Sequence, residues 1–200
     1  MITCVGDSNG WGWDPAGGRH PAALRWPDRL ARALDLPLQN LSQPGRTLLF
    51  EDPVRGLISA RDTWQAALAA RPHYLVLALG INDLAAGGDT AAIAQALAHY
   101  LNAWQTAGQP GRLLLLAPAP LLALQDPWRR LFGPSAAQSA ALLPLWQAAA
   151  SRWQLDCLDP APLLAGSADG LHWTAQDHAA IAEALAARLG AQVGPSARPG

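Results

Sequence analysis

Short apolar runs alternate with longer segments of helical periodicity along almost the whole chain. The runs are apolar on consecutive residues, which is typical of strands buried on both faces of a parallel sheet. Five such strands are predicted, at residues 2–5, 38–41, 74–79, 112–117 and 154–158. Helices are predicted between and after them, at residues 22–34, 53–70, 90–107, 135–152 and 175–189. This order predicts an α/β protein, a flavodoxin-like three-layer α/β/α sandwich with a five-stranded parallel sheet.

The length of the chain limits how many domains it can form. Its 200 residues suffice for one α/β domain and hardly for two, and no internal repeat is present. We therefore expect a single domain over residues 1–190. Residues 191–200 are rich in proline and glycine, which predicts a disordered C-terminal tail.

The charge composition argues against several kinds of partner. The net charge is −1 and only 14% of the residues are charged, so nothing attracts the chain electrostatically to nucleic acid or to an anionic membrane. No run approaches the ~18 apolar residues that a membrane-spanning helix needs. The first residues lack a basic segment followed by an apolar signal core, which predicts a cytoplasmic protein.

Three residue types limit the chemistry that is available. All 14 basic residues are arginine, and without lysine the chain can form neither a Schiff base nor a Walker-type phosphate loop. Cys4 and Cys157 lie in apolar, strand-like segments without CxxC spacing and are expected to be buried free thiols. Because the histidines and cysteines form no ligand cluster in the sequence, we expect neither a metal site nor a cofactor.

Polar, glycine-containing segments follow four of the five predicted strands. They are Gly-Asp-Ser-Asn at residues 6–9, Ser-Gln-Pro-Gly at 42–45, Gly-Ile-Asn-Asp at 80–83 and Asp-Gly-Leu-His at 169–172. In parallel α/β sheets the ligand crevice lies beyond the carboxyl ends of the strands. We therefore expect these four segments to meet at one edge of the sheet and to form a site there.

These segments contain the groups that acyl transfer by a serine requires. Ser8 ends a buried strand at a glycine-flanked turn and is the candidate nucleophile. His172 is the candidate base, and Asp169, three residues earlier, is placed to accept a hydrogen bond from its ring. The backbone N–H groups of Ser8 and Gly45 and the side-chain amide of Asn82 are candidate donors for an oxyanion hole. A glycine at position 45 also lets the backbone approach the substrate closely.

Neighbouring polar residues are assigned structural roles. Asp7 is expected to bond to the backbone near the nucleophile, and Asp83 to support Asn82. Four further histidines compete for the role of base: His20, His73, His99 and His178. None of the four has a carboxylate at the spacing of Asp169 and His172, and capping or surface exposure accounts for His178.

Nine tryptophans are many for this length, and most lie in segments predicted to form helices or strands. Trp11, Trp13 and Trp173 differ because they flank the candidate nucleophile and base in the sequence. They are predicted to line the acyl or alcohol pocket. The loop at residues 118–134 is also rich in apolar side chains, and it is expected either to wall an acyl pocket or to form a contact between subunits.

The four segments together resemble the SGNH (GDSL-type) hydrolase superfamily, with every block in order across residues 2–189. The family's four named residues map onto Ser8, Gly45, Asn82 and His172. The stretch Gly-Asp-Ser-Asn-Gly-Trp-Gly-Trp at residues 6–13 is similar to the branch that contains arylesterases and acetyl-ester acyltransferases. This chain has Gly10 where that branch generally has threonine, which predicts a looser turn beside the nucleophile.

The resemblance implies a serine carboxylic ester hydrolase that acts on short-chain, acetyl-type esters of aryl or simple alcohols. Members of the branch also transfer acyl groups to other alcohols and some assemble into oligomers, so acyltransferase activity and a homo-oligomer are further expectations. A carbohydrate O-acetylesterase is the alternative enzyme, and a non-catalytic binding module on the same fold is the alternative of another class. The expected partner is a small-molecule ester.

Overall fold

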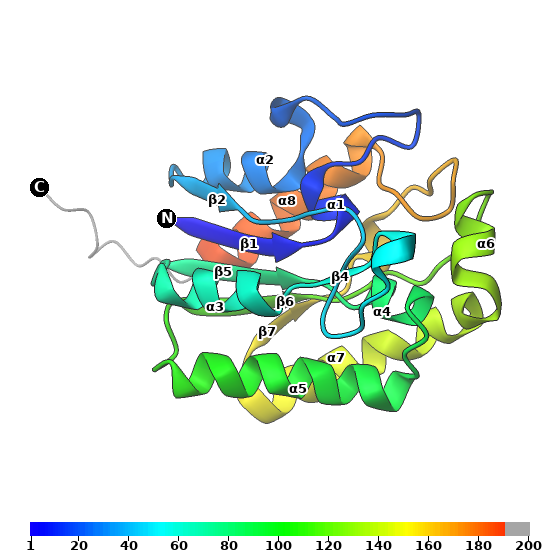
Figure 1. Ribbon diagram of the computed structural model, residues 1–200. Coiled ribbons are helices and arrows are strands. Elements are labelled where there is room, and N and C mark those ends of the chain that lie inside the picture. The colour runs from blue at the N-terminus through cyan, green and yellow to red at the C-terminus, as the bar shows by residue number, and fades with distance from the viewer. Residues whose placement is uncertain (191–200) are drawn as a thin grey trace, which may run out of the picture.

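The computed structural model describes residues 1–190, and at its centre lies a five-stranded sheet in which all neighbouring strands are parallel (Figure 1). The strands lie side by side in the order β2-β1-β5-β6-β7. Their bounds are Ile2–Gly6 for β1, Leu38–Asn40 for β2, Tyr74–Ala78 for β5, Arg112–Leu116 for β6 and Asp156–Leu158 for β7. All five predicted strands are present, and the predicted parallel α/β fold is confirmed.

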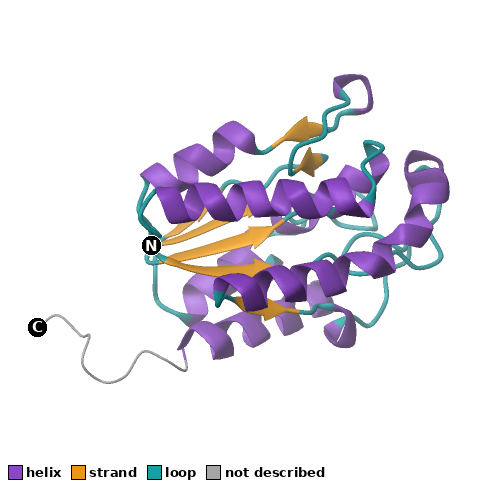
Figure 2. Cartoon of the chain, turned by 90° about the horizontal axis from the view of Figure 1, so that it is seen from below, coloured by secondary structure: helices purple, strands orange, loops and turns teal. Residues whose placement is uncertain are grey.

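Helices cover both faces of this sheet, as Figures 1 and 2 show. One face carries α3 (Arg61–Ala69), α5 (Thr90–Thr106) and α7 (Leu142–Trp153), and the other carries α2 (Trp26–Ala33) and α8 (Ala175–Gly190). Strand β5 contributes to both cores, because Leu75 and Leu77 pack in the first and Val76 packs in the second. Consecutive strand residues point to opposite faces, so an uninterrupted apolar run is what a sheet covered on both sides requires.

Short elements gather at the carboxyl ends of the strands. Helix α1 (Ser8–Trp11) follows β1, α4 (Ile81–Ala85) follows β5, and α6 (Trp128–Phe132) lies in the connection after β6. A separate two-stranded parallel sheet pairs β3 (Arg46–Thr47) with β4 (Ile58–Ser59). Single 3-10 segments occupy Ala22–Leu24, Pro53–Arg55, Gly133–Ala141 and Ala161–Leu163. The sequence predicts turns or helices at these positions. It does not predict the two short strands β3 and β4.

Three predicted helices begin later than their apolar spacing suggests. In residues 53–70, the side chain of Asp52 caps a 3-10 turn that Gly56 ends at a φ of +74°, and the chain then forms β4 before α3 begins. In residues 22–34, the backbone of Arg25 is extended and separates a 3-10 turn from α2, whose first turn contains Pro27. In residues 135–152, a 3-10 segment precedes α7.

Three further sequence predictions concern features away from the sheet edge. Both cysteines are free, and Cys4 is buried whereas Cys157 is half-buried. Burial raises the pKa of the Cys157 thiol to about 11, and the nearby Asp159 adds to this shift. Within residues 1–190, no helix is both long and apolar enough to cross a membrane. The tail predicted at residues 191–200 lies outside the described residues.

Candidate active site

The turn after β1 presents Ser8 at the carboxyl edge of the sheet. Asp7 caps α1, because its Oδ1 accepts a hydrogen bond from the N–H of Asn9 at 2.9 Å. Gly12 ends the helix with a φ of +94°, a left-handed conformation that glycine adopts readily. Ser8 is therefore the first residue of a one-turn helix that is fixed at both ends, and only 7% of it is exposed. The structural role predicted for Asp7 is confirmed.

Gly10, in the same turn, packs closely against the loop that follows β2. A Cβ at this position would overlap the side chain of Ser42. The side-chain amide of Asn40 also donates to the carbonyl oxygen of Gly10 at 2.9 Å. The looser turn that a glycine here predicts is therefore not found, because the neighbouring loop fills the space that a larger side chain would occupy.

The structure brings Ser8, His172 and Asp169 into one hydrogen-bonded chain. His172 Nε2 lies 3.0 Å from Ser8 Oγ, and His172 Nδ1 lies 2.7 Å from Asp169 Oδ2. An ionised carboxylate accepts hydrogen bonds only, so Asp169 favours the tautomer with the proton on Nδ1. That tautomer leaves the lone pair of Nε2 facing the serine hydroxyl, which is the arrangement a general base requires.

Asp169 is held in its charged form by several donors. Its Oδ1 accepts from the backbone N–H of Leu171 at 2.9 Å and of His172 at 2.8 Å, and from the hydroxyl of Ser167 at 2.9 Å. Its Oδ2 accepts from Trp128 Nε1 at 3.0 Å as well as from the histidine ring. Burial alone would raise the pKa of Asp169, but the hydrogen bonds from His172 and Leu171 outweigh burial and hold the pKa well below its usual range.

The predicted oxyanion donors lie on two neighbouring segments. Gly45 has a φ of +73°, and a Cβ there would overlap the carbonyl oxygen of Gly56, so position 45 requires glycine. Among the described residues, the backbone N–H groups of Ser8 and Gly45 donate no hydrogen bond. The amide of Asn82 donates one of its two hydrogens to the carbonyl oxygen of Arg46 at 3.0 Å, which places it beside Gly45 and leaves its second hydrogen available.

Asp83 fixes the segment that follows Gly45. Its carboxylate is fully buried and accepts from the backbone N–H groups of Leu48 at 2.8 Å and Leu49 at 3.1 Å. Burial raises the pKa of Asp83 to about 6, while these hydrogen bonds act in the opposite direction. The residue next to Asn82 therefore connects α4 to the loop of Gly45, which is the supporting role that the sequence predicts for Asp83.

Aromatic rings cover His172. The ring of Trp13 stacks on it with 5.1 Å between centroids, and the ring of Trp128 meets it edge-on at 4.8 Å. Trp11 lies one position further out, 6.1 Å from Trp13, and carries the guanidinium of Arg19 over its ring at 4.5 Å. Of the three tryptophans predicted to line the pocket, Trp13 and Trp11 therefore lie on this side.

Trp173, the third tryptophan predicted to line the pocket, lies elsewhere. Its side chain is 6% exposed and packs in the core beneath α2 and α8. It lines a cavity behind the loop of His172. The backbone at this position turns the side chain inward, because the N–H of Trp173 is bound to Asn9 and its carbonyl oxygen lies 3.0 Å from His20 Nε2.

Two residues support the site in ways the sequence does not reveal. Asn9 holds the backbone on both sides of His172, since its amide donates to the carbonyl oxygen of Leu171 at 3.2 Å and accepts from the N–H of Trp173 at 3.0 Å. Trp128 supplies the indole N–H that reaches Asp169. Asn9 adjoins the candidate nucleophile in the sequence, which is a weak signal, whereas nothing local to Trp128 indicates its contact.

The competing histidines have other partners. His20 does have a carboxylate, since its Nδ1 lies 3.3 Å from Asp14 Oδ2, a pairing that its six-residue spacing did not suggest. His178 is fully buried, so surface exposure does not account for it, and its Nδ1 accepts from the N–H of Trp26 at 3.3 Å. Burial lowers the pKa of His178 to about 3, so it is uncharged at neutral pH. Among residues 1–190, no three histidine, cysteine or acidic side chains are placed together to hold a metal ion.

A parallel α/β sheet with a serine, a histidine and a carboxylate linked at its carboxyl edge defines a serine hydrolase. The family model described as "GDSL-like Lipase/Acylhydrolase family" matches residues 4–194, and the chain belongs to that family. The sequence resemblance to SGNH (GDSL-type) hydrolases is thereby confirmed, and the protein is a serine carboxylic ester hydrolase. A comparison with curated proteins gives no match.

Solved structures share this fold over almost the whole chain. An aryl esterase from M. smegmatis is 24% identical with a TM-score of 0.86, covering 96% of this chain and 99% of its own. A carbohydrate acetylesterase from Sinorhizobium meliloti is 25% identical with a TM-score of 0.85, covering 95% and 98%. A proposed arylesterase from Agrobacterium tumefaciens is 29% identical with a TM-score of 0.81, also covering 95% and 98%.

Changing Asp169 to asparagine should lower kcat for an ester substrate by about 10⁴, because an amide in place of the carboxylate favours the wrong histidine tautomer. Trp128→Phe keeps an aromatic ring beside His172 and removes one donor to Asp169, so we expect a smaller loss of roughly tenfold. Steady-state kinetics on both variants, with Trp153→Phe as a matched control, measure these losses. Asp169→Asn with more than a tenth of wild-type activity would contradict the arrangement.

The stability of the protein should depend on the ionisation of Asp7. Burial raises the pKa of Asp7 to about 7, well above the usual range of an aspartate, so the folded state keeps a proton that the unfolded chain releases. Unfolding free energy should therefore fall, relative to the Asp7→Asn variant, as pH rises from about 4 to about 7, at up to about 1.4 kcal/mol per pH unit. Urea unfolding of both proteins across this range measures the difference. A difference that is constant with pH would show that Asp7 is already ionised.

Proposed function

We propose that the protein hydrolyses short-chain acyl esters of aryl or simple alcohols, with Ser8 as nucleophile, His172 as general base and Asp169 as the group that orients it. The observation that carries this proposal is the continuous chain of hydrogen bonds, 3.0 Å from Ser8 Oγ to His172 Nε2 and 2.7 Å from His172 Nδ1 to Asp169 Oδ2. A side-chain arrangement of this kind activates a hydroxyl that is otherwise a weak nucleophile.

The reaction proceeds in two halves. Ser8 Oγ attacks the ester carbonyl as His172 Nε2 takes its proton, and the negative oxygen that forms accepts hydrogen bonds from the N–H groups of Ser8 and Gly45 and from Asn82. When this intermediate collapses, His172 returns the proton to the departing alcohol, and the acyl group stays on Ser8. His172 then takes a proton from water as the water oxygen attacks the acyl group, and it returns that proton to Ser8 Oγ when the bond to Ser8 breaks, which releases the acid and restores the free serine. Each oxyanion donor contributes about 10²–10³ in rate.

The surroundings of His172 support a small substrate. The rings of Trp13 and Trp128 lie against the imidazole and 5.6 Å from each other, so this side of the site is walled by flat apolar surfaces. Such walls suit an acetyl or propionyl group or an aryl leaving group better than a long acyl chain. Transfer of the acyl group to an alcohol in place of water uses the same groups and is part of the proposal.

A carbohydrate O-acetylesterase is the second candidate. The similarity to the Sinorhizobium meliloti carbohydrate acetylesterase, at 25% identity over 95% of this chain, favours it. The aromatic and apolar surroundings of His172 favour the simple ester, because they offer few hydrogen-bond partners for sugar hydroxyls. A single domain over residues 1–190, a cytoplasmic location and a homo-oligomer stay predictions from the sequence.

Replacing Ser8 with alanine tests the serine mechanism. We expect kcat for p-nitrophenyl acetate to fall by roughly 10⁴–10⁶, because the nucleophile is lost while the oxyanion donors remain. Ser151→Ala, at an exposed position of α7, is the matched control and should keep wild-type activity. Unchanged turnover by Ser8→Ala would rule out the serine mechanism and leave the binding-module alternative.

A substrate series tests the class of ester. p-Nitrophenyl acetate should have a kcat/KM at least about tenfold above that of the octanoate. Each methylene group of the octanoyl chain that finds no space in the pocket costs about 1–3 kcal/mol of transition-state binding. Acetylated xylan is measured in parallel with the same protein. A higher acetate-release rate from xylan than from the aryl acetate would favour the carbohydrate esterase, and a preference for octanoate would contradict the small pocket.

A further inference from the structure

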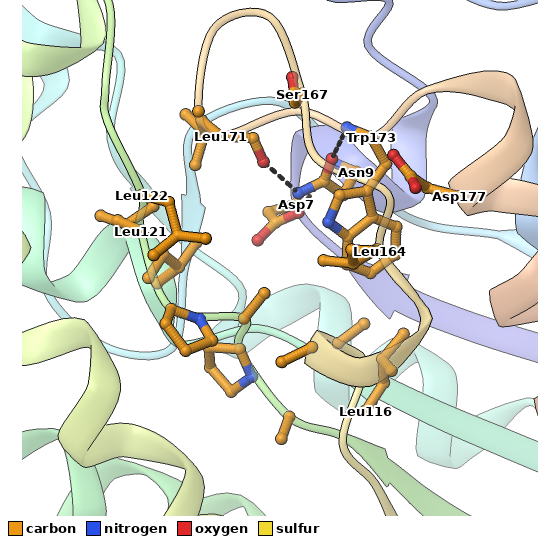
Figure 3. A pocket seen from close by; sticks show the side chains of 18 of the residues that line it. Asp7, Asn9, Leu116, Leu121, Leu122, Leu164, Ser167, Leu171, Trp173 and Asp177 are labelled. Atoms are coloured by element: carbon orange, nitrogen blue, oxygen red, sulfur yellow. Dashed lines mark hydrogen bonds between the residues drawn. The ribbon is translucent and has the colours of Figure 1, made fainter.

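A cavity of about 250 Å³ lies behind the loop that carries Asp169 and His172. It lies among the segments that follow β1, β5, β6 and β7, and residues 118–123 and 161–173 supply much of its wall (Figure 3). Its walls are mainly apolar and include Leu79, Leu116, Leu121, Leu122, Leu164 and Trp173. Of the groups proposed for catalysis, neither the nucleophile, nor the base, nor Gly45 or Asn82 lines it, so within the described residues it is a separate space from the ester site.

One charged side chain faces this cavity. Figure 3 shows Asp7 among the apolar lining residues, with its carboxyl group directed into the space they surround. Asp7 is only 6% exposed, and its Oδ1 accepts from the N–H of Asn9. Among residues 1–190, no hydrogen bond reaches its Oδ2 and no arginine or histidine forms an ion pair with it. A buried carboxylate without a cation is costly, and burial accordingly raises its pKa.

Three other polar side chains of the cavity wall already have partners, whereas the indole N–H of Trp26, a donor and not an acceptor, has none among the described residues. The Asn9 amide bonds to Leu171 and Trp173. Asp177 accepts from the N–H groups of Ala165 and Thr174. The hydroxyl of Ser167 donates to Asp169. Among the side chains described here, Asp7 is therefore the polar group of this cavity with an acceptor oxygen to offer, and a ligand that fits must bring a donor.

We propose that this cavity binds a small organic ammonium ion, whose charged group pairs with Asp7 and whose aryl or alkyl body fills the apolar space. An ammonium ion supplies both the donor and the positive charge that Asp7 lacks, whereas an alcohol supplies only the donor. An apolar cavity of roughly 150 Å³ is large enough for benzene, so the volume here accommodates one ring with an aminomethyl group. It is smaller than the ~300–1,000 Å³ typical of sites for larger ligands.

The occupant would also contact the segment that positions His172. Asn9, Leu171 and Trp173 line the cavity, and the hydrogen bonds among them hold the backbone on either side of His172. A bound ammonium ion should therefore change ester turnover without competing with the ester, a consequence that rests on the proposed function. Binding itself does not depend on that function and is measured directly.

Isothermal titration with benzylamine at pH 8, where Asp7 is ionised, tests the proposal. The wild type should bind one molecule, and Asp7→Asn should bind at least about tenfold more weakly because the ion pair is lost. Asparagine caps a helix as well as aspartate does, so this variant should fold. Ser8→Ala should bind within about twofold of the wild type, and benzyl alcohol should bind the wild type at least about tenfold more weakly than benzylamine.

A second variant protects the test against a failure of Asp7→Asn to fold. Ala119→Phe places a ring in the cavity from its half-buried wall and leaves Asp7 unchanged, so benzylamine binding should again fall at least about tenfold.

Equal affinity in either variant, or no binding by the wild type at millimolar benzylamine, would overturn the proposal. Loss of binding in Ser8→Ala would place the amine in the ester site, and equal affinity for benzyl alcohol would show that charge is irrelevant. A loss of esterase activity in Ser8→Ala with binding intact separates this proposal from the proposed function.

Discussion

The site depends on one constraint, which is that all five strands of the sheet run in the same direction. Every connection that leaves the carboxyl end of a strand therefore starts at the same edge, and residues as far apart as Ser8 and His172 come within 3.0 Å of each other. Two covered faces leave this edge as the place where backbone amides and polar side chains can meet a ligand. The glycines in the tight turns at positions 12 and 45 follow from this convergence at one edge. Several chain segments share a small space there, and a Cβ at either position would overlap a neighbouring segment.

Within that edge, carboxylates do most of the positioning. Asp7 caps the helix of the proposed nucleophile, Asp83 holds the backbone after Gly45, and Asp169 binds the ring of the proposed base. The three carboxylates differ in how fully hydrogen-bond donors stabilise their negative charge. Asp169 has side-chain and backbone donors and a lowered pKa, whereas burial dominates for Asp7 and Asp83 and raises theirs. The same residue type therefore serves as a permanent charge beside the histidine and as a group that titrates near neutrality behind it.

The sequence predicted what is encoded locally. The five strands follow from apolar runs, and the Asp169–His172 pair follows from a three-residue spacing that one loop can satisfy. It did not predict the contact of Trp128 with Asp169, since the two are 41 residues apart and meet only because the connection after β6 folds back over the histidine. Trp173 illustrates the opposite case: its neighbour in the sequence is His172, yet the direction of its side chain is set by the tertiary bonds of its backbone, and it enters the core.

The position of Trp128 links two properties that are often altered separately. Its ring forms part of the wall around the histidine, and its N–H binds the carboxylate that orients that histidine. A change in the 118–134 connection that widens the space for a larger acyl group would also move a donor away from Asp169. Directed evolution for bulkier esters in this scaffold therefore meets a trade-off between breadth of substrate and turnover, and compensating changes would have to supply Asp169 with a new donor from another loop.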